Sequence, residues 1–236
     1  PSSIGDYAFY ACKKILSLTF PDSMRTVGKY AFAWCSGVKT VDMGSGMREI
    51  GPYSFYYMTG MTAVKLGSGM KTVGNYAFYK DSKLATVDLG GTEVIGASAF
   101  SGDKKIAALT VPATMREIGA YAFNKCTGLT SLTLEPGVKT IEAYAFSGCS
   151  KIPSLTIPDT VTAIGNSAFS QCSAMAELKL SPATKSYGNG VFSYCSKLTN
   201  VELPDGLTAV VDSMFMQCAN LASVTIPDSV TAIGPR

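Results

Sequence analysis

Apolar residues recur along this chain with one fixed period, which the phenylalanines show most clearly. Ten of them follow one another at intervals of 23 residues, with a single interval of 22: Phe9, Phe32, Phe55, Phe78, Phe100, Phe123, Phe146, Phe169, Phe192 and Phe215. A period of this length is typical of a solenoid, in which each unit buries its apolar face only against its neighbours. The sequence therefore predicts about ten stacked coils of one kind.

Two spacings of apolar residues within each period predict two extended segments. In the run 221–226, Val224 and Ile226 alternate with a polar residue, as a strand with one buried face requires. A Pro or Gly ends this run in most copies and takes the chain out of the sheet. A second apolar pair three residues apart, such as Val161 and Ile164, predicts a shorter extended piece.

A glycine column and the sequence Ala-Phe-x-x-Cys complete the predicted coil. Since only Gly takes positive φ cheaply, the column predicts a corner four residues before each Phe. Ala, Phe and Cys would share one side of a short helical turn. The expected fold is a repeat solenoid: a parallel β-sheet, second extended segments and short helical turns. The column comprises Gly5, Gly28, Gly51, Gly74, Gly96, Gly119, Gly165 and Gly188.

The full period, Leu-x-x-Val-x-Ile-Pro-x-x-Val-x-x-Ile-Gly-x-x-Ala-Phe-x-x-Cys, resembles the repeat of the BspA-like leucine-rich repeat family over essentially the whole chain. The resemblance implies a right-handed solenoid from a bacterial or protist cell-surface or secreted protein, with adhesion and host or matrix binding as its function. Local departures are Glu142 and Val211 in the glycine column, Tyr187 before it, and the short interval after Phe78.

Length and composition fit one elongated domain over residues 1–236 without a linker. The net charge of +3 is too small to indicate a nucleic-acid-binding protein. No apolar run is long enough for a membrane span, and no signal peptide is recognisable. The chain begins with Pro1-Ser2-Ser3-Ile4-Gly5, without Met, and stops just after Ile233-Gly234, at the same phase of the repeat, so we expect a segment of a longer protein.

The polar and sulfur chemistry of the chain does not predict a catalytic site, a metal site or a cofactor. There is no His, which removes the commonest general base and metal ligand. The ten periodic Phe residues are expected to stack as a ladder through the coils. Each Cys lies three residues after one of these ladder Phe residues and is expected to be a buried free thiol, although disulfide pairing between neighbouring coils stays open. The seven are Cys12, Cys35, Cys126, Cys149, Cys172, Cys195 and Cys218.

Two carboxylates, Asp81 and Asp103, replace Cys in the coils on either side of the short interval. If both were buried, at least one pKa would rise. The favoured interpretation is that this coil opens to solvent and pairs the carboxylates with Lys80, Lys104 and Lys105. These coils are then the least regular part of the solenoid.

Aromatic residues outside the ladder gather in the first four coils and form the leading candidate for a ligand-binding surface. Rings on one edge can bind sugars, peptides or a protein. The alternative, which the recurrence of Tyr two residues before several Phe favours, is that they cover the core structurally. The candidate ligand-binding residues are Tyr30, Trp34, Tyr53, Tyr56, Tyr57, Tyr76 and Tyr79.

A column of basic residues is a weaker candidate, for anions. It occupies one position of the repeat, so its members point the same way in a stack, and a simply solvated face is the favoured alternative. The column comprises Arg25, Arg48, Lys71, Arg116 and Lys139, with Lys185 further on.

Together these patterns predict a non-enzymatic binding module with protein or glycan partners and no nucleic acid. The alternative is a structural protein whose complementary end coils stack head to tail into filaments.

Overall fold

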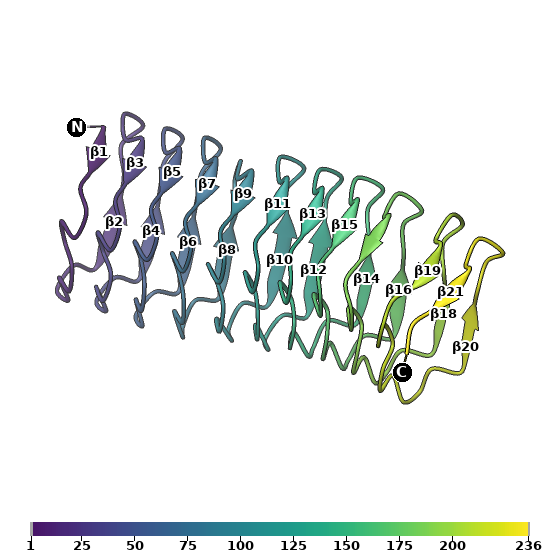
Figure 1. The fold of residues 1–236 in the computed structure, drawn as a ribbon. Coiled ribbons are helices and arrows are strands. Elements are labelled where there is room, and N and C mark those ends of the chain that lie inside the picture. The colour runs from purple at the N-terminus through teal and green to yellow at the C-terminus, as the bar shows by residue number, and fades with distance from the viewer. Residues whose placement is uncertain (1, 236) are drawn as a thin grey trace.

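The computed structural model describes residues 2–235 and shows one continuous parallel β-solenoid (Figure 1). In each coil a short strand leads into a series of turns along one edge, and a main strand then returns the chain to a turn at the opposite edge. All regular elements in the described part of the chain are strands, and none is a helix.

The main strands pair in parallel but form several short sheets. The strands β2, β4, β6 and β8 make one sheet, and later strands pair two by two as β10-β12, β14-β16 and β18-β20. Their bounds are β2 Ser17–Thr19, β4 Thr40–Asp42, β6 Ala63–Lys65, β8 Thr86–Asp88, β10 Ala108–Val111, β12 Ser131–Leu134, β14 Ser154–Thr156, β16 Glu177–Lys179, β18 Asn200–Glu202 and β20 Ser223–Thr225.

The second extended segments are only two residues long, yet nine of them form the longest sheet, from β1 to β17, and β19 pairs with β21. They are β1 Ser3–Ile4, β3 Thr26–Val27, β5 Glu49–Ile50, β7 Thr72–Val73, β9 Val94–Ile95, β11 Glu117–Ile118, β13 Thr140–Ile141, β15 Ala163–Ile164, β17 Ser186–Tyr187, β19 Ala209–Val210 and β21 Ala232–Ile233.

The short interval leaves this longer sheet intact. Lys65 pairs with Asp88 at the usual spacing of 23, whereas Thr72 pairs with Val94 at a spacing of 22. The missing residue therefore falls in the turn between Asp88 and Val94, where a deletion does not disturb the strands on either side.

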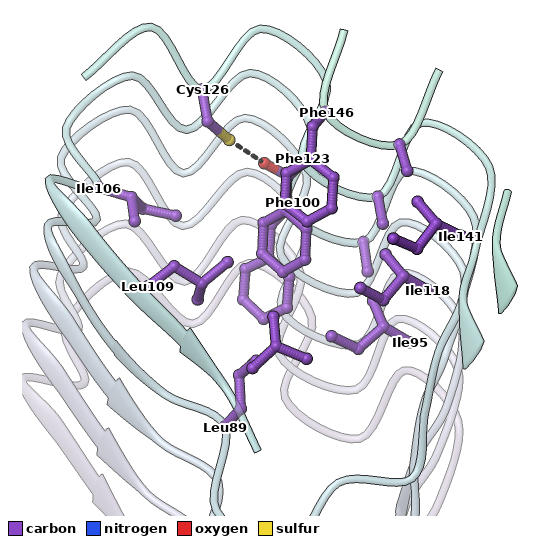
Figure 2. Packing of buried hydrophobic residues seen from close by; sticks show 14 of the residues in the cluster. Leu89, Ile95, Phe100, Ile106, Leu109, Ile118, Phe123, Cys126, Ile141 and Phe146 are labelled. Atoms are coloured by element: carbon purple, nitrogen blue, oxygen red, sulfur yellow. Dashed lines mark hydrogen bonds between the residues drawn. The ribbon is translucent and has the colours of Figure 1, made fainter. Parts of the chain in front are cut away.

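The Phe ladder is the centre of the core, as the period predicts. Successive rings from Phe9 to Phe215 stack with centroids 4.9 to 5.9 Å apart and planes within 14° of parallel. Figure 2 shows Phe100, Phe123 and Phe146 between Leu109 on one side and Ile118 on the other. Only the two end rings escape full burial, since Phe9 is 41% exposed and Phe215 is half-buried.

The predicted helical turn is wrong, although the burial it predicted is confirmed. Ala122, Phe123 and Cys126 are fully buried, but the backbone N–H of Phe123 donates to a carbonyl 22 residues later, in the next coil, at 2.8 Å. Tyr121 and Lys125 make the same contact at 2.9 and 2.8 Å, and both have positive φ, near 60°. Alternate peptide groups thus face the next coil, which a helix, with all its N–H groups bonded within the segment, does not allow.

The glycine column does form a corner, but the physical reason we expected for it is also wrong. None of these glycines has positive φ. Instead the backbones of neighbouring coils come so close at most of these glycines that an added side chain would force a local shift, as the coils with Glu142 and Val211 in this column must accommodate. A Cβ atom at Gly74 would lie 2.5 Å from the carbonyl carbon of Gly51, and one at Gly28 would lie 2.7 Å from that of Gly5. Glycine at φ > 0 is found at other positions of the coil, such as Gly44, Gly67 and Gly90 at the opposite edge and Gly148 just after a ladder Phe.

Candidate functional site

The tyrosines two residues before the ladder Phe form a second ladder on the outside of the turns. Ring centroids are 5.2 Å apart between Tyr7 and Tyr30, 4.7 Å between Tyr30 and Tyr53, and 4.8 Å between Tyr53 and Tyr76. Their planes lie within 17° of parallel. Ser98 occupies the next position and ends the row. Positive φ at all four tyrosines places these rings where the backbone turns.

Rings one and two residues after the ladder Phe extend this row sideways. Trp34 stacks on Tyr57 at 4.5 Å, and Tyr56 stacks on Tyr79 at 5.7 Å. Edge-to-face contacts, such as the one at 5.5 Å between Tyr53 and Tyr56, join the rows. The structure therefore brings the seven predicted rings together and joins Tyr7 and Tyr10 to them. We call this surface the aromatic face: Tyr7, Tyr10, Tyr30, Trp34, Tyr53, Tyr56, Tyr57, Tyr76 and Tyr79.

Both interpretations of these rings have a basis in the structure. The stacking shows that each ring covers its neighbours, as structural cover requires. At the same time Tyr7 is 54%, Tyr10 47% and Trp34 39% exposed, while the other six tyrosines of the aromatic face are half-buried. Tyr30 and Tyr53 have a ring stacked on each face, whereas the other stacked rings have one such partner.

The electrostatics of the aromatic face are set by lysines at its margins. The Lys80 ammonium lies 5.1 Å from the centroid of the Tyr79 ring, and that of Lys29 lies 5.5 Å from that of Tyr30. The neighbouring Tyr79 phenol raises the pKa of Lys80, so the ammonium stays charged. Desolvation raises the pKa of Tyr53 and Tyr56, so their hydroxyls stay neutral hydrogen-bond donors at physiological pH.

The basic column links coils to one another. Arg25 Nη1 donates to the Gly46 carbonyl oxygen of the next coil at 3.1 Å, and Arg48 Nη1 donates to that of Gly69 at 2.9 Å. Glu93 occupies the column position in the short coil, where it pairs with Lys71 and with Arg116, whose Nε lies 3.6 Å away. Most members of the column therefore bind neighbouring coils, and the Glu93 carboxylate interrupts the row of positive charges. Anion binding there remains a prediction.

The favoured interpretation of Asp81 and Asp103 is wrong, because both side chains are fully buried. Asp81 Oδ1 accepts a hydrogen bond from the Met58 backbone N–H at 2.6 Å, and Asp103 Oδ1 accepts one from the Asp81 backbone N–H at 2.8 Å. Each Oδ2 atom is buried without a partner. Burial raises the pKa of both carboxyls well above the ordinary value, and the Asp81 charge adds to the rise at Asp103.

The coils around these carboxylates are also regular, contrary to expectation. Phe78 and Phe100 stack at 4.9 Å, the shortest separation in the ladder. The carboxyls occupy the same place as the thiols of other coils, so their burial follows from their position in the repeat. Only the main-strand sheet is interrupted at this point, between β8 and β10.

The cysteine column is interior, as predicted. All seven thiols are free and all but Cys12 are buried. Each buried thiol donates to the carbonyl oxygen of the ladder Phe of the preceding coil, as Cys126 does to Phe100 at 3.3 Å (Figure 2). Burial raises the pKa of Cys172 to about 12 and that of Cys149 well above its ordinary value, so these thiols are poor nucleophiles.

Across residues 2–235, no three His, Cys, Asp or Glu side chains lie close enough together to hold a metal ion. Within the same residues, no helix has the length and apolar character needed to cross a membrane.

The stacked coils, the buried ladder and the parallel strands define a leucine-rich repeat solenoid. Sequence comparison makes this specific: the model of the BspA type Leucine rich repeat region matches residues 2–130 and again residues 116–236. The chain belongs to this BspA-type leucine-rich repeat family. Among curated proteins, none matches the chain.

Several bacterial proteins of known structure are similar to this chain. A leucine-rich repeat protein from Eubacterium ventriosum is 16% identical, with a TM-score of 0.55 over 98% of this chain and 78% of its own. The T. pallidum Leucine Rich Repeat protein is 23% identical, with a TM-score of 0.51 over 84% and 75%. A leucine rich cell surface protein from Faecalibacterium prausnitzii is 24% identical, with a TM-score of 0.49 over 99% and 83%.

Proposed function

We propose that the chain is a non-enzymatic binding and adhesion module of a cell-surface or secreted protein, and that the aromatic face is its recognition surface. The observation that supports this proposal is the contiguity of the rings. Nine rings touch one another over four coils at the edge of the solenoid, and three of them are more than one-third exposed. A large exposed aromatic patch is typical of an interaction site.

The arrangement of the rings favours a protein partner over a glycan on this face. A sugar ring binds best against an open aromatic face, whereas eight of the nine rings here have at least one face covered by another ring, and Tyr30 and Tyr53 are covered on both faces. Stacking therefore leaves less open ring face for a sugar than separate rings would. Tyr and Trp are also enriched among the residues that dominate protein interfaces, because they combine apolar area with a polar group.

The first test removes three rings from the middle of the aromatic face. Trp34→Ala, Tyr56→Ala and Tyr57→Ala together are expected to weaken binding to a protein partner by about thirtyfold or more, because aromatic anchors commonly contribute about 2 kcal/mol at an interface. Binding of the native chain and the variant to a panel of immobilised extracellular-matrix proteins, by surface plasmon resonance, measures the loss.

A matched control keeps the number of lost rings comparable. Tyr121→Ala with Tyr144→Ala removes a stacked pair at 4.8 Å that lies outside the aromatic face, and it is expected to leave binding unchanged. Circular dichroism reports whether each variant folds. If the triple variant unfolds while binding per folded molecule stays the same, the rings are structural cover and the proposal is wrong.

A second candidate function, head-to-tail association, has its own structural basis. The first coil exposes Leu16 by 67% and Phe9 by 41%, and the last exposes Ile233 by 65% and Ile226 by 48%. These apolar faces match the interior surface between two coils, and in a longer protein neighbouring coils would cover them.

Light scattering separates the two functions. A binding module keeps a constant mass when the 236-residue chain is concentrated, whereas a filament former grows. Growth that is abolished by Phe9→Asp with Ile233→Asp would identify the end coils as the contact. A constant mass at all concentrations would exclude the filament.

A further inference from the structure

The exposed lysines of this protein are concentrated on one arc of the coil, between the ladder Phe and the main strand that follows. Of the 20 Lys and Arg residues, ten lie on this arc, and all ten are exposed. We call it the lysine edge. It comprises Lys13, Lys14, Lys39, Lys80, Lys83, Lys104, Lys105, Lys125, Lys151 and Lys197.

No exposed carboxylate neutralises the lysine edge. Of the 17 Asp and Glu residues, only Asp81 and Asp103 fall on the same arc, and both are buried inside the coil. The ion pairs of the described residues involve Lys71, Glu93 and Arg116, which lie on another side of the coil. Although the net charge is only +3, the charged side chains are unevenly distributed. The lysine edge is positive, and the remaining surface carries more carboxylates than cations.

The lysine edge is hollowed where it crosses the sixth to ninth coils. A shallow groove of about 470 Å³ runs between two columns of the repeat. One column, two residues after the ladder Phe, contributes Lys125, Gly148, Gln171 and Tyr194 in successive coils. The other column contributes Thr127, Ser150 and Ser173, and Lys104 stands at the N-terminal end.

The backbone explains why the groove is open. Gly148 lies beside Lys125, and a Cβ atom at this glycine would approach Lys125 Cγ to 3.2 Å. Gly148 also has a φ of 76°, which Gly adopts without the steric cost that other residues bear. A missing side chain therefore leaves room in the column between the lysine and Gln171.

We propose that this groove binds an acidic glycan. Cations lie at one end, where a carboxylate or sulfate group would pair with Lys104 and Lys125. Hydroxyl and amide groups of Thr127, Ser150, Ser173 and Gln171 line the middle and match the hydroxyls of a sugar chain. Tyr194 lies at the other end, 45% exposed, and no aromatic ring of residues 2–235 stacks on it. No stacked ring therefore stands between Tyr194 and a sugar ring, whereas Tyr30 and Tyr53 of the aromatic face are covered by rings on both faces.

The residues that line the groove fit a protein or a nucleic acid less well than a glycan. The groove has one large apolar side chain, Tyr194, and no aliphatic residue, whereas several large apolar anchors typically fill the centre of a protein interface. A single-stranded nucleic acid binds through several rings on which successive bases stack, and the groove offers one. The proposal does not depend on the aromatic face, which lies on earlier coils and is tested with different substitutions.

The test measures binding of the 236-residue chain to three polymers by isothermal titration calorimetry at low ionic strength. Polygalacturonate is the acidic glycan, dextran the neutral glycan and polyglutamate a polyanion without sugars. We expect polygalacturonate to bind, dextran to bind far more weakly, and polyglutamate to bind more weakly than polygalacturonate. Raising the salt concentration is expected to weaken the glycan complex, because the lysines are solvent-exposed.

Three variants locate the site. Lys104→Gln with Lys125→Gln is expected to weaken polygalacturonate binding by roughly thirtyfold, since each exposed charge pair contributes about 1 kcal/mol. Tyr194→Ala is expected to weaken it by about fivefold without affecting polyglutamate. Lys65→Gln with Lys179→Gln, which removes two positive charges from main strands β6 and β16, is the matched control and is expected to change little.

Several outcomes would overturn the proposal. One is equal affinity for polygalacturonate and polyglutamate together with no effect of Tyr194→Ala, which would indicate unspecific charge attraction. Another is an equal loss in the control variant, which would mean that the charge is not localised. A native chain that does not bind polygalacturonate would overturn it as well. Circular dichroism of all variants ensures that lost binding does not reflect unfolding.

Discussion

Replacing Phe123 by Ala is expected to lower the free energy of unfolding by about 3 to 5 kcal/mol, the cost of removing a fully buried aromatic side chain. The ring lies between Phe100 and Phe146, at centroid distances of 5.2 and 5.3 Å. Backbone hydrogen bonds between coils fix the spacing of the stack, so the neighbouring rings cannot close over the cavity. Urea denaturation followed by circular dichroism measures the change.

The control for this substitution is the same change at the end of the ladder. Phe9 is 41% exposed and has a ring neighbour on one side only, so Phe9→Ala is expected to cost much less than Phe123→Ala. Equal losses at the two positions, or an unchanged unfolding midpoint for Phe123→Ala, would show that the ladder is not the centre of the core.

Replacing Asp81 and Asp103 by Cys, the residue that this column holds in most coils, is expected to raise the free energy of unfolding by about 1 to 3 kcal/mol at pH 8. Both carboxyls are buried and each has one oxygen without a hydrogen-bond partner. A thiol in this column instead donates to the Phe carbonyl of the preceding coil, as Cys126 does.

Because of Asp81 and Asp103, we also expect the free energy of unfolding to depend on pH. Burial raises the folded-state pKa of Asp81 and Asp103 above that of the unfolded chain, near 3.9, so the protonated form is the one that suits the fold. Their favourable contribution is complete below the unfolded pKa and is lost as the pH rises through the raised folded pKa. The advantage of the double Cys variant should therefore grow from pH 4 to pH 8.

Denaturation of the native chain and the variant at several pH values measures this difference. Asp205→Asn, at an exposed carboxylate, is the control and should follow the native chain at every pH. An advantage of the double variant that does not change with pH would show that the buried carboxyls are already ionised in the fold.

Much of this protein follows from the sequence alone because the architecture is repetitive. The period of the Phe ladder specifies the number of coils, and the agreement of many columns over ten copies specifies the family. Burial of Ala122, Phe123 and Cys126 follows from the same pattern. In a solenoid each residue packs against the equivalent residues of the next coils, so a column in the sequence is a contact in space.

The structure decided how the backbone makes each coil. Tyr121 and Lys125 adopt positive φ, which their residue types do not indicate, because alternate peptide groups must bond to the next coil. Position 74 favours Gly because a Cβ atom there would lie 2.5 Å from the backbone of the neighbouring coil. The sequence pattern does not reveal this distance. The burial of Asp81 and Asp103 likewise reflects position in the stack more than residue type.

For the aromatic face and the lysine edge, too, the sequence supplied part of the information and the structure the rest. The sequence placed the rings of the aromatic face in the first four coils, but only the structure shows which rings stack and that Tyr30 and Tyr53 are covered on both faces. The lysine edge was present in the sequence as scattered Lys residues at several positions of the repeat. These positions become one surface only when the turn folds, because the arc between Phe and main strand buries its carboxylates and leaves every lysine in solvent.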